Sequence, residues 1–242
     1  MRRRWIADTV SPGTGHPTHA ALTGDQALHL AKVLRAEPGQ IFDVVAAGFL
    51  HRAEITTVAL DKVEFVLHEE LASDCSLPLH LYLAIFKFDH FEWAIEKATE
   101  LGVARITPVL ARRTEKNLAQ ASIKRVERWR RIAHEASQQS RRTSVPAITD
   151  PTSLKVALGS EEALTRILLS ETEQTLTLSE ALAAHESCSQ TALAIGPEGG
   201  WTPEEMTLFT QHGWIHVTLG PRILRAETAA IAAMAIAGSF LG

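Results

Sequence analysis

Two turns of the chain hold the side chains best suited to chemistry. The GPEGG turn, Gly196–Gly200, follows the apolar run Ala192–Ile195 and sets Glu198 among glycines. The LGPRILR turn, Leu219–Arg225, follows a second apolar run and leads into Glu227. Glycine allows a ligand to approach the backbone closely, and parallel sheets bind ligands outside the carboxyl ends of their strands. Both turns therefore occupy the position of ligand-binding loops.

Structural roles compete with chemical ones at several of these positions. Thr202, Pro203 and Glu205 have the pattern of a helix N-cap, a first-turn proline and a capping-box acid, so we expect them to be structural. Glu227 could likewise serve to orient Arg225 or to cap the helix that follows. Glu198 lies inside its turn and caps no evident helix, which favours a role at a ligand.

The elements that must position these turns alternate between strand and helix in the C-terminal two thirds of the chain. The predicted strands are Leu79–Phe86, Arg105–Ala111, Arg166–Ser170, Ala192–Gly196 and Trp214–Gly220. We expect helices capped by Asp89, opened by Ser122 and starting near Arg225, with two more at about Leu178–Ala184 and Thr202–Gln211. The alternation predicts an α/β domain with a mostly parallel sheet covered on both faces.

The N-terminal part of the chain predicts a smaller, β-rich module. Strands are expected within RWIAD, IFDVVAAGFLHRAEITTVA and KVEFVLHEEL. Thr23 can cap a helix that carries Leu28, Ala31 and Leu34 on one face. Consecutive strands without intervening helices indicate a small barrel or sandwich. The polar stretch Leu71–Leu77 is the best boundary, which gives domains at residues 1–72 and 73–242.

Charge is distributed unevenly along a chain whose formal net charge is −4. Residues 111–145 hold ten arginines and lysines but three acidic residues, whereas the following segment is acidic. A basic segment of this kind suits a protein that binds a polyanion while staying near neutral overall. A solvated helix face would give the same pattern.

Composition and motifs exclude several other classes. The 45% hydrophobic fraction is that of a globular protein, and no apolar run reaches the roughly 18 residues of a membrane helix. The chain has no G-x-G-x-x-G after a strand, no G-x-x-x-x-G-K-[ST] and no H-E-x-x-H. HESC, His185–Cys188, could supply half a metal site, but no second half is evident, so we expect no metal. Two cysteines and no signal peptide favour a cytoplasmic protein.

Four segments resemble one enzyme family in the same order along the chain. They are ATELGVARITPVLARRTE (Ala98–Glu115), HEASQQSRRTSVP (His134–Pro146), IGPEGGWTPEE (Ile195–Glu205) and LGPRILRAETAA (Leu219–Ala230). They are similar to the SPOUT-superfamily methyltransferases that modify N3 of a uridine in 16S ribosomal RNA. HLAKVLRAEPGQ (His29–Gln40) resembles the PUA-like RNA-binding domain of that family. Trp201 stands where the family often has phenylalanine.

The resemblance implies a C-terminal SPOUT domain with a deep trefoil knot and an N-terminal PUA-like barrel. It implies S-adenosylmethionine as cofactor, 16S ribosomal RNA in the small ribosomal subunit as substrate, uridine 1498 of that RNA as target, and a homodimer. The implied cofactor-binding residues are Leu169, Ser170, Gly196, Pro197, Glu198, Gly199, Gly200, Leu219, Gly220, Ile223, Leu224, Arg225, Thr228 and Ala229.

Methylation of uracil N3 requires removal of a proton and stabilisation of the resulting anion. We expect Arg225 to stabilise the anion and Glu198 or Glu227 to accept the proton. The expected RNA contacts are Arg2, Arg3, Arg4, Lys32, Arg35, Arg112, Arg113, Arg141 and Arg142. Two alternatives stay open: ribose 2′-O methylation of another RNA, and a non-catalytic role in ribosome assembly.

Overall fold

The computed structural model describes residues 4–11, 18–72, 76–184 and 189–241, and these form two compact units. The first unit comprises Met1–Cys75 together with Ser137–Ser144, and the second comprises Ser76–Ala136 and Val145–Gly242. The segment Ser137–Ser144 is part of the first unit although the predicted domain ranges place it in the second domain. The run His185–Cys188 and both cysteines lie outside the described residues.

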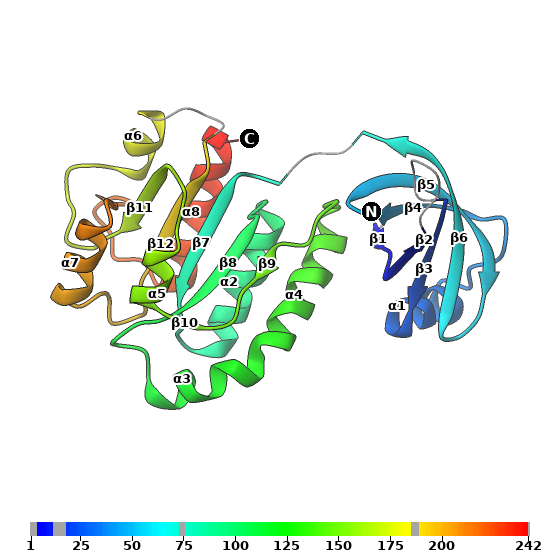
Figure 1. Ribbon diagram of the computed structural model, residues 1–242, viewed down its shortest axis with the longest axis horizontal. Helices are drawn as coiled ribbons and strands as arrows, with labels where there is room; N and C mark the ends of the chain where they lie inside the picture. The colour runs from blue at the N-terminus through cyan, green and yellow to red at the C-terminus, as the bar shows by residue number, and fades with distance from the viewer. Residues whose placement is uncertain (1–3, 12–17, 73–75, 185–188, 242) are drawn as a thin grey trace. The chain divides into compact units, whose positions relative to one another are not determined.

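The first unit is built on a strongly curved, six-stranded sheet with the strand order β1-β4-β5-β6-β3-β2 (Figure 1). Its strands are β1 Trp5–Ile6, β2 Thr9–Ser11, β3 His19–Thr23, β4 Ile41–Ala46, β5 Phe49–Val58 and β6 Lys62–Leu71. β1 pairs in parallel with β4, and all the other neighbours are antiparallel. The predicted β-rich module is confirmed.

The helical turn of the first unit differs from its prediction. α1, Gly24–Leu28, continues as the π-helical turn η1, His29–Val33, and this change of pitch moves the buried face to Ala27 and Leu30. Leu28 and Leu34 are therefore exposed, and the predicted apolar face is wrong. Thr23 is the N-cap residue, but its hydroxyl and amide donate to the Asp8 carboxylate instead of capping the helix.

The second unit contains a seven-stranded, entirely parallel sheet in the order β10-β8-β7-β12-β11-β13, with β9 beside β8. Its strands are β7 Leu79–Ala84, β8 Arg105–Leu110, β9 Ala147–Ile148, β10 Thr152–Ser153, β11 Thr165–Leu169, β12 Thr191–Ile195 and β13 Ile215–Val217. The five predicted strands are all present. β9 and β10 are two residues each, too short for a periodic signal.

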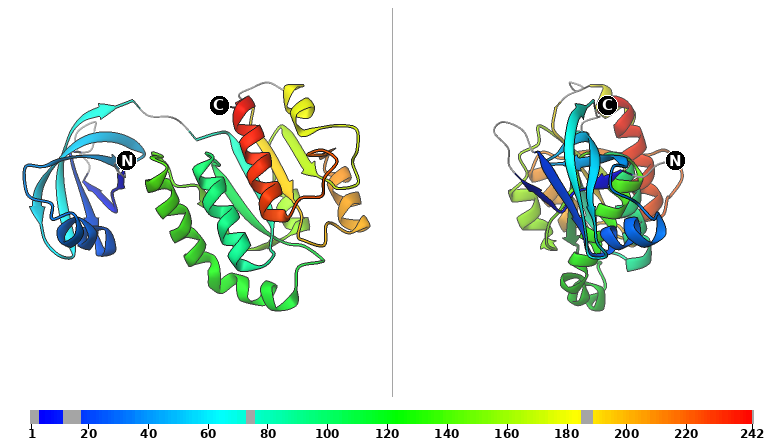
Figure 2. Two further views of the ribbon diagram at one scale, coloured as in Figure 1. Left: turned by 180° about the vertical axis from the view of Figure 1, so that it is seen from behind. Right: turned by 90° about the vertical axis from the view of Figure 1, so that its right-hand side faces the viewer.

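Helices cover both faces of this sheet (Figures 1 and 2). The helices are α2 Phe88–Glu100, α3 Lys116–Ser122, the 3₁₀ turn η2 Ile123–Arg125, α4 Val126–Gln139, α5 Leu154–Gly159, α6 Leu178–Ala183, α7 Pro203–Gln211 and α8 Ala226–Leu241. α2, α4, α6 and α8 pack on one face, and α5 and α7 on the other. Alternation along β7 explains this, because Leu81 and Leu83 enter the first core while Tyr82 and Ala84 enter the second.

Helix boundaries agree with the sequence where a capping box is present. Thr202 caps α7, with Glu205 completing the reciprocal pair, as predicted. Asp89, in contrast, lies in the first turn of α2, because the cap is Lys87. Ser122 ends α3, and the basic helix α4 begins four residues later at Val126. The trefoil knot that the resemblance implies stays a prediction.

Candidate functional site

A large pocket lies at the carboxyl ends of β11, β12 and β13 in the second unit, with a volume of about 1120 Å³. The helix that follows β12 packs on the opposite face of the sheet from those that follow β7, β11 and β13. Connections that leave in opposite directions open a crevice at the strand ends. The lining residues are 87, 90, 169–174, 177, 195–198, 200, 201, 206, 217–226 and 229.

The GPEGG turn forms the wall after β12. Its chain reverses through a hydrogen bond of 2.8 Å from the Gly200 amide to the Pro197 carbonyl, and Gly200 has φ +70°. The turn then enters α7 through Thr202, whose amide and hydroxyl are both engaged with Glu205. The capping box therefore anchors one end of the turn, and β12 anchors the other.

The loop after β11 forms a second wall. The sequence predicted only Leu169 and Ser170 here, whereas Glu171–Gln174 and Thr177 line the pocket as well. The Glu173 carboxylate accepts hydrogen bonds from the Thr175 hydroxyl and from the amides of Thr175, Leu176 and Gln174. These bonds, that from the Thr175 hydroxyl first, lower the pKa of Glu173 to about 2. The ionised carboxylate thereby holds the loop in one conformation beside the pocket.

The LGPRILR turn forms the third wall. The Thr218 hydroxyl bonds both the amide and the carbonyl of Gly220, each at 3.1 Å, and so fixes the exit from β13. Ile223 is 85% exposed and Arg225 is exposed, although both line the pocket. The Arg225 carbonyl accepts from the Ala229 amide, which places this arginine at the start of α8.

A buried carboxylate lies just behind this wall. Glu227 is 3% exposed, and its Oε1 lies 3.6 Å from Nδ1 of His90, a pocket-lining residue at the start of α2. The other oxygen of Glu227, Oε2, is buried without a hydrogen-bond partner among the described residues. Buried carboxylate oxygens are rarely left unpaired, so this one is a candidate acceptor for a bound group.

Most of the predicted cofactor residues meet at this one pocket. All of them line it except Gly199 and Thr228. Among the predicted catalytic residues, Arg225 and Glu198 line the pocket, whereas Glu227 is buried behind it.

The sequence missed several lining residues, namely Lys87, His90, Glu171, Thr172, Glu173, Gln174, Thr177 and Met206. The first two follow β7 and the next five follow β11, so the rule that ligands bind at carboxyl ends could have identified both loops. The sequence does not reveal the strand order, which places β7 and β11 on the two sides of β12.

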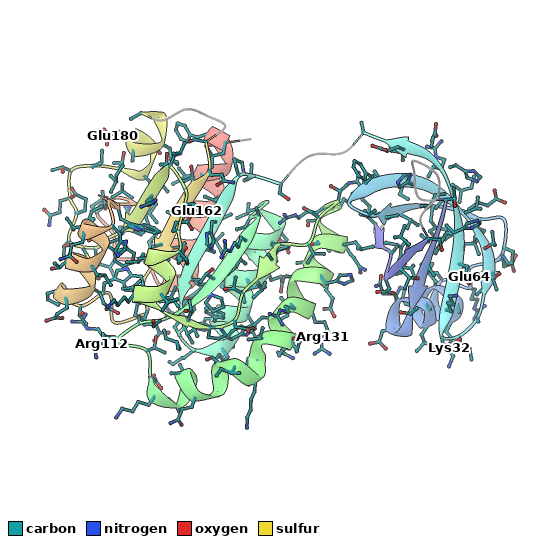
Figure 3. All side chains as sticks on the ribbon, viewed as in Figure 1. Lys32, Glu64, Arg112, Arg131, Glu162 and Glu180 are labelled. Carbon is teal, nitrogen blue, oxygen red and sulfur yellow. The ribbon has the colours of Figure 1, made fainter. Side chains whose placement is uncertain are left out.

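The predicted RNA-binding residues are divided between the two units. In the first, Lys32 and Arg35 are exposed, Arg4 donates to the Arg141 carbonyl, and burial lowers the pKa of Arg142 to about 10. In the second, Arg112 and Arg113 are exposed on the loop between β8 and α3. Figure 3 labels Arg112 and, in the first unit, Lys32. Arg2 and Arg3 lie outside the described residues.

Part of the basic segment is neutralised within the second unit. Arg125 and Arg128 bind the two oxygens of Glu92 at 3.1 and 2.9 Å. Arg130 binds Asp150 at 3.0 Å and also Glu127. These three arginines have the carboxylate partners that the solvated-face alternative expects.

The pocket residues fit S-adenosylmethionine, which joins an apolar adenine face to a cationic sulfonium and a zwitterionic amino acid. Aliphatic side chains such as Ile223 and Leu224 can cover an adenine ring, while Glu171 and Glu198 offer negative charge to a cation. The indole N–H of Trp201 is buried without a partner among the described residues, and it is a donor that a ligand can satisfy.

The described part of the chain contains neither a membrane-spanning helix nor a cluster of metal-binding side chains. No helix there is both long and apolar enough to span a bilayer. No group of three or more histidine, cysteine, aspartate or glutamate side chains there could hold a metal ion.

Comparison with known proteins identifies the chain's relatives. Residues 73–238 match the family of RNA methyltransferase domains, and residues 22–67 match the RNA methyltransferase PUA domain. The chain is 32% identical to ribosomal RNA small subunit methyltransferase E of Bacillus subtilis, over 97% of this chain and 94% of that protein. The corresponding protein of a Synechocystis strain is 34% identical, over 88% of this chain and 71% of that protein.

Solved structures of methyltransferases resemble this chain over nearly its whole length. Ribosomal RNA small subunit methyltransferase E from Neisseria gonorrhoeae, bound to S-adenosyl methionine, superposes with a TM-score of 0.82 at 29% identity and covers 97% of this chain and 96% of its own. A putative methyltransferase from Legionella pneumophila with bound SAM gives 0.83 at 28% identity, with coverage of 99% and 98%. The chain therefore belongs to the ribosomal RNA small subunit methyltransferase E family.

Proposed function

We propose that this protein transfers a methyl group from S-adenosylmethionine to N3 of one specific uridine in 16S ribosomal RNA of the small ribosomal subunit. The observation that carries the proposal is the meeting of the GPEGG and LGPRILR turns at one pocket, in a chain related over almost its whole length to ribosomal RNA small subunit methyltransferases. The domain limits proposed with it are 1–72 for RNA binding and 73–242 for methyl transfer.

The cofactor would be held by three walls: the GPEGG turn, the LGPRILR turn with Ala229, and Leu169 with Ser170 at the end of β11. When bound, S-adenosylmethionine supplies an electrophilic methyl group on a sulfonium. The protein's contribution is to hold this group and the target base in register, which by itself lowers the barrier by several kcal/mol. Gly199 and Thr228 belong to the same two segments, although neither lines the pocket.

Residues of the protein would stabilise the negative charge on the uracil and accept the proton from N3. The proposed role of Arg225 is to stabilise negative charge on the uracil oxygens once N3 loses its proton, and its exposure in the pocket lining supports this role. Glu198 and Glu227 are the candidate proton acceptors. The unpaired oxygen of Glu227 favours it, whereas Glu198 has the more open access.

A uracil stacked in RNA must leave the stack to enter such a pocket. The exposed Lys32, Arg35 and Arg112 are proposed phosphate contacts, together with Arg4, Arg141 and the undescribed Arg2 and Arg3. We propose a homodimer in the cytoplasm. The exposed side of α8 supports a dimer because its side chains are uncharged and mostly small. Ala232 and Ile236 are partly exposed there, and Ala235 is exposed.

The proposal is tested by incubating purified protein with labelled S-adenosylmethionine and small ribosomal subunits. We expect label in 3-methyluridine, and label in a 2′-O-methylated ribose would instead identify the ribose-methylating alternative. Arg225→Ala should reduce the rate at least roughly 100-fold, the size expected for loss of a group that stabilises transition-state charge. Lys155 of α5 is exposed and does not line the pocket, so Lys155→Ala provides the matched control. Activity of Arg225→Ala close to that of the control would exclude the stabilising role.

A further inference from the structure

Arg113 makes a contact that its predicted role as an RNA ligand does not explain. Its guanidinium Nη1 donates a hydrogen bond to the carbonyl of Gly199, in the middle of the GPEGG turn. Arg113 belongs to the loop after β8, whereas the turn follows β12, and β7 lies between these two strands in the sheet. The side chain therefore crosses the carboxyl end of β7 to reach the turn.

The loop that carries Arg113 is fixed on both sides of it. The Arg112 amide donates to Glu205 Oε1 at 2.8 Å, and Glu205 is also the capping-box acid of α7. The Thr114 hydroxyl donates to the Ile85 carbonyl at 3.0 Å, just after β7. Because the backbone on both sides of Arg113 is already held, its contact with the turn costs the conformational entropy of the side chain but little further ordering of the loop.

Arg113 contacts the turn at a residue that is not part of the pocket lining. Gly196, Pro197, Glu198 and Gly200 line the pocket, but neither Gly199 nor Arg113 does. The carbonyl that Arg113 binds therefore belongs to the one residue of the turn that does not line the pocket.

The identity of residue 199 agrees with this arrangement. Gly199 does not have positive φ, so its backbone conformation does not require glycine. A Cβ at this position would lie 3.3 Å from Cδ and 3.6 Å from Cβ of Arg113, and the first of these distances is closer than most carbon contacts. The close passage of the arginine thus accounts for a glycine that the backbone alone would not demand.

We propose that Arg113 is a positioning residue that holds the GPEGG turn in its ligand-binding conformation, and that it is not primarily an RNA contact. The inference rests on the proposed function for the identity of the ligand, S-adenosylmethionine. A charge-assisted hydrogen bond to a turn carbonyl is stronger than a neutral one, and its loss frees the turn to relax in the absence of ligand. Binding must then restore the turn, so affinity falls.

The experiment compares Arg113→Ala, Arg113→Lys and Arg112→Ala by calorimetric titration with S-adenosylmethionine and by binding to a 16S RNA fragment at several salt concentrations. Arg113→Ala should raise the Kd for S-adenosylmethionine roughly five- to tenfold and change RNA affinity less than about twofold. Arg113→Lys should lie between this variant and the wild type, because an ammonium can donate one bond to the same carbonyl. The Arg112 side chain makes no hydrogen bond to the turn among the described residues. Arg112→Ala should therefore weaken RNA binding and leave the Kd for S-adenosylmethionine within about twofold of the wild type.

A double-mutant cycle with Gly199→Ala adds a readout that a general loss of stability would not give. Alanine at 199 should weaken cofactor binding when Arg113 is present and have little further effect in Arg113→Ala, which is a coupling between contacting residues. Additive effects would overturn the inference. The inference would also be overturned if Arg113→Ala bound S-adenosylmethionine like the wild type while the slope of log RNA affinity against log salt concentration decreased by about one. A wild-type protein that does not bind S-adenosylmethionine would instead overturn the proposed function, and the inference with it.

Discussion

Replacing Gly200 by alanine should damage the pocket more than the fold. Gly200 has φ +70°, a left-handed conformation that costs a residue with a side chain roughly 1–2 kcal/mol. The new Cβ would also lie 2.7 Å from Glu171 Oε1, so this carboxylate must move away. The lower entropy of the unfolded alanine chain offsets about 0.4–1 kcal/mol of the strain. We therefore expect a net loss of about 1 kcal/mol, or roughly 2–4 °C in Tm for a chain of this size.

The free energy of cofactor binding should decrease by more than the free energy of unfolding. In the free variant the turn can relax out of its strained conformation, and binding must then restore it. A cost of about 1–2 kcal/mol corresponds to a rise in Kd of about five- to thirtyfold. Calorimetric titration with S-adenosylmethionine and thermal unfolding of the same preparations measure the two effects separately.

Gly213 provides the matched control. It has φ +73°, no atom lies within 4 Å of its would-be Cβ, and it follows α7 without lining the pocket. Gly213→Ala should lower the Tm by a similar amount and leave the Kd within about twofold. Unchanged cofactor affinity in Gly200→Ala, or an equal loss in Gly213→Ala, would refute the description of the GPEGG turn as a preformed wall.

Two further predictions concern stability. Burial opposes ionisation of Glu161, but hydrogen bonds from His80 and Tyr82 outweigh it and lower the pKa of Glu161 to about 2. The ionised group therefore stabilises the fold fully above about pH 4.5 and loses this effect as the pH falls toward 2, a change of about 2–3 kcal/mol once solvent screening is allowed for. Denaturant unfolding of Glu161→Gln should show a flatter pH dependence in that window, and a slope equal to that of the wild type would contradict the assignment. Thr202→Ala removes the cap on Glu205's amide and should cost about 0.5–2 kcal/mol in the same assay, with no measurable change counting against the capping box.

The sequence predicted the parts of the site that are local. The GPEGG turn follows an apolar strand and precedes a capping box, and both signals lie within a dozen residues of one another. The LGPRILR turn has the same local form, between β13 and α8. Each of these elements could be placed without knowledge of the rest of the fold.

Contacts between distant segments could not be predicted in this way. His90 and Glu227 lie far apart in the chain and meet because α2 and α8 pack on the same face of the sheet. Arg113 was assigned to RNA from its charge alone, and its contact with Gly199 depends on the order of β8, β7 and β12. The π turn after α1 moved the buried face of a helix that propensity and periodicity placed elsewhere.

The nucleosides of 16S ribosomal RNA provide the most direct test of the proposed reaction. Mass spectrometry of this RNA, from cells with and without the protein, should show 3-methyluridine in the first and none in the second. Adding purified protein and S-adenosylmethionine to small subunits from the deficient cells should restore the modified nucleoside. An equal level of 3-methyluridine in both kinds of cell would contradict the proposed reaction, whatever the pocket binds.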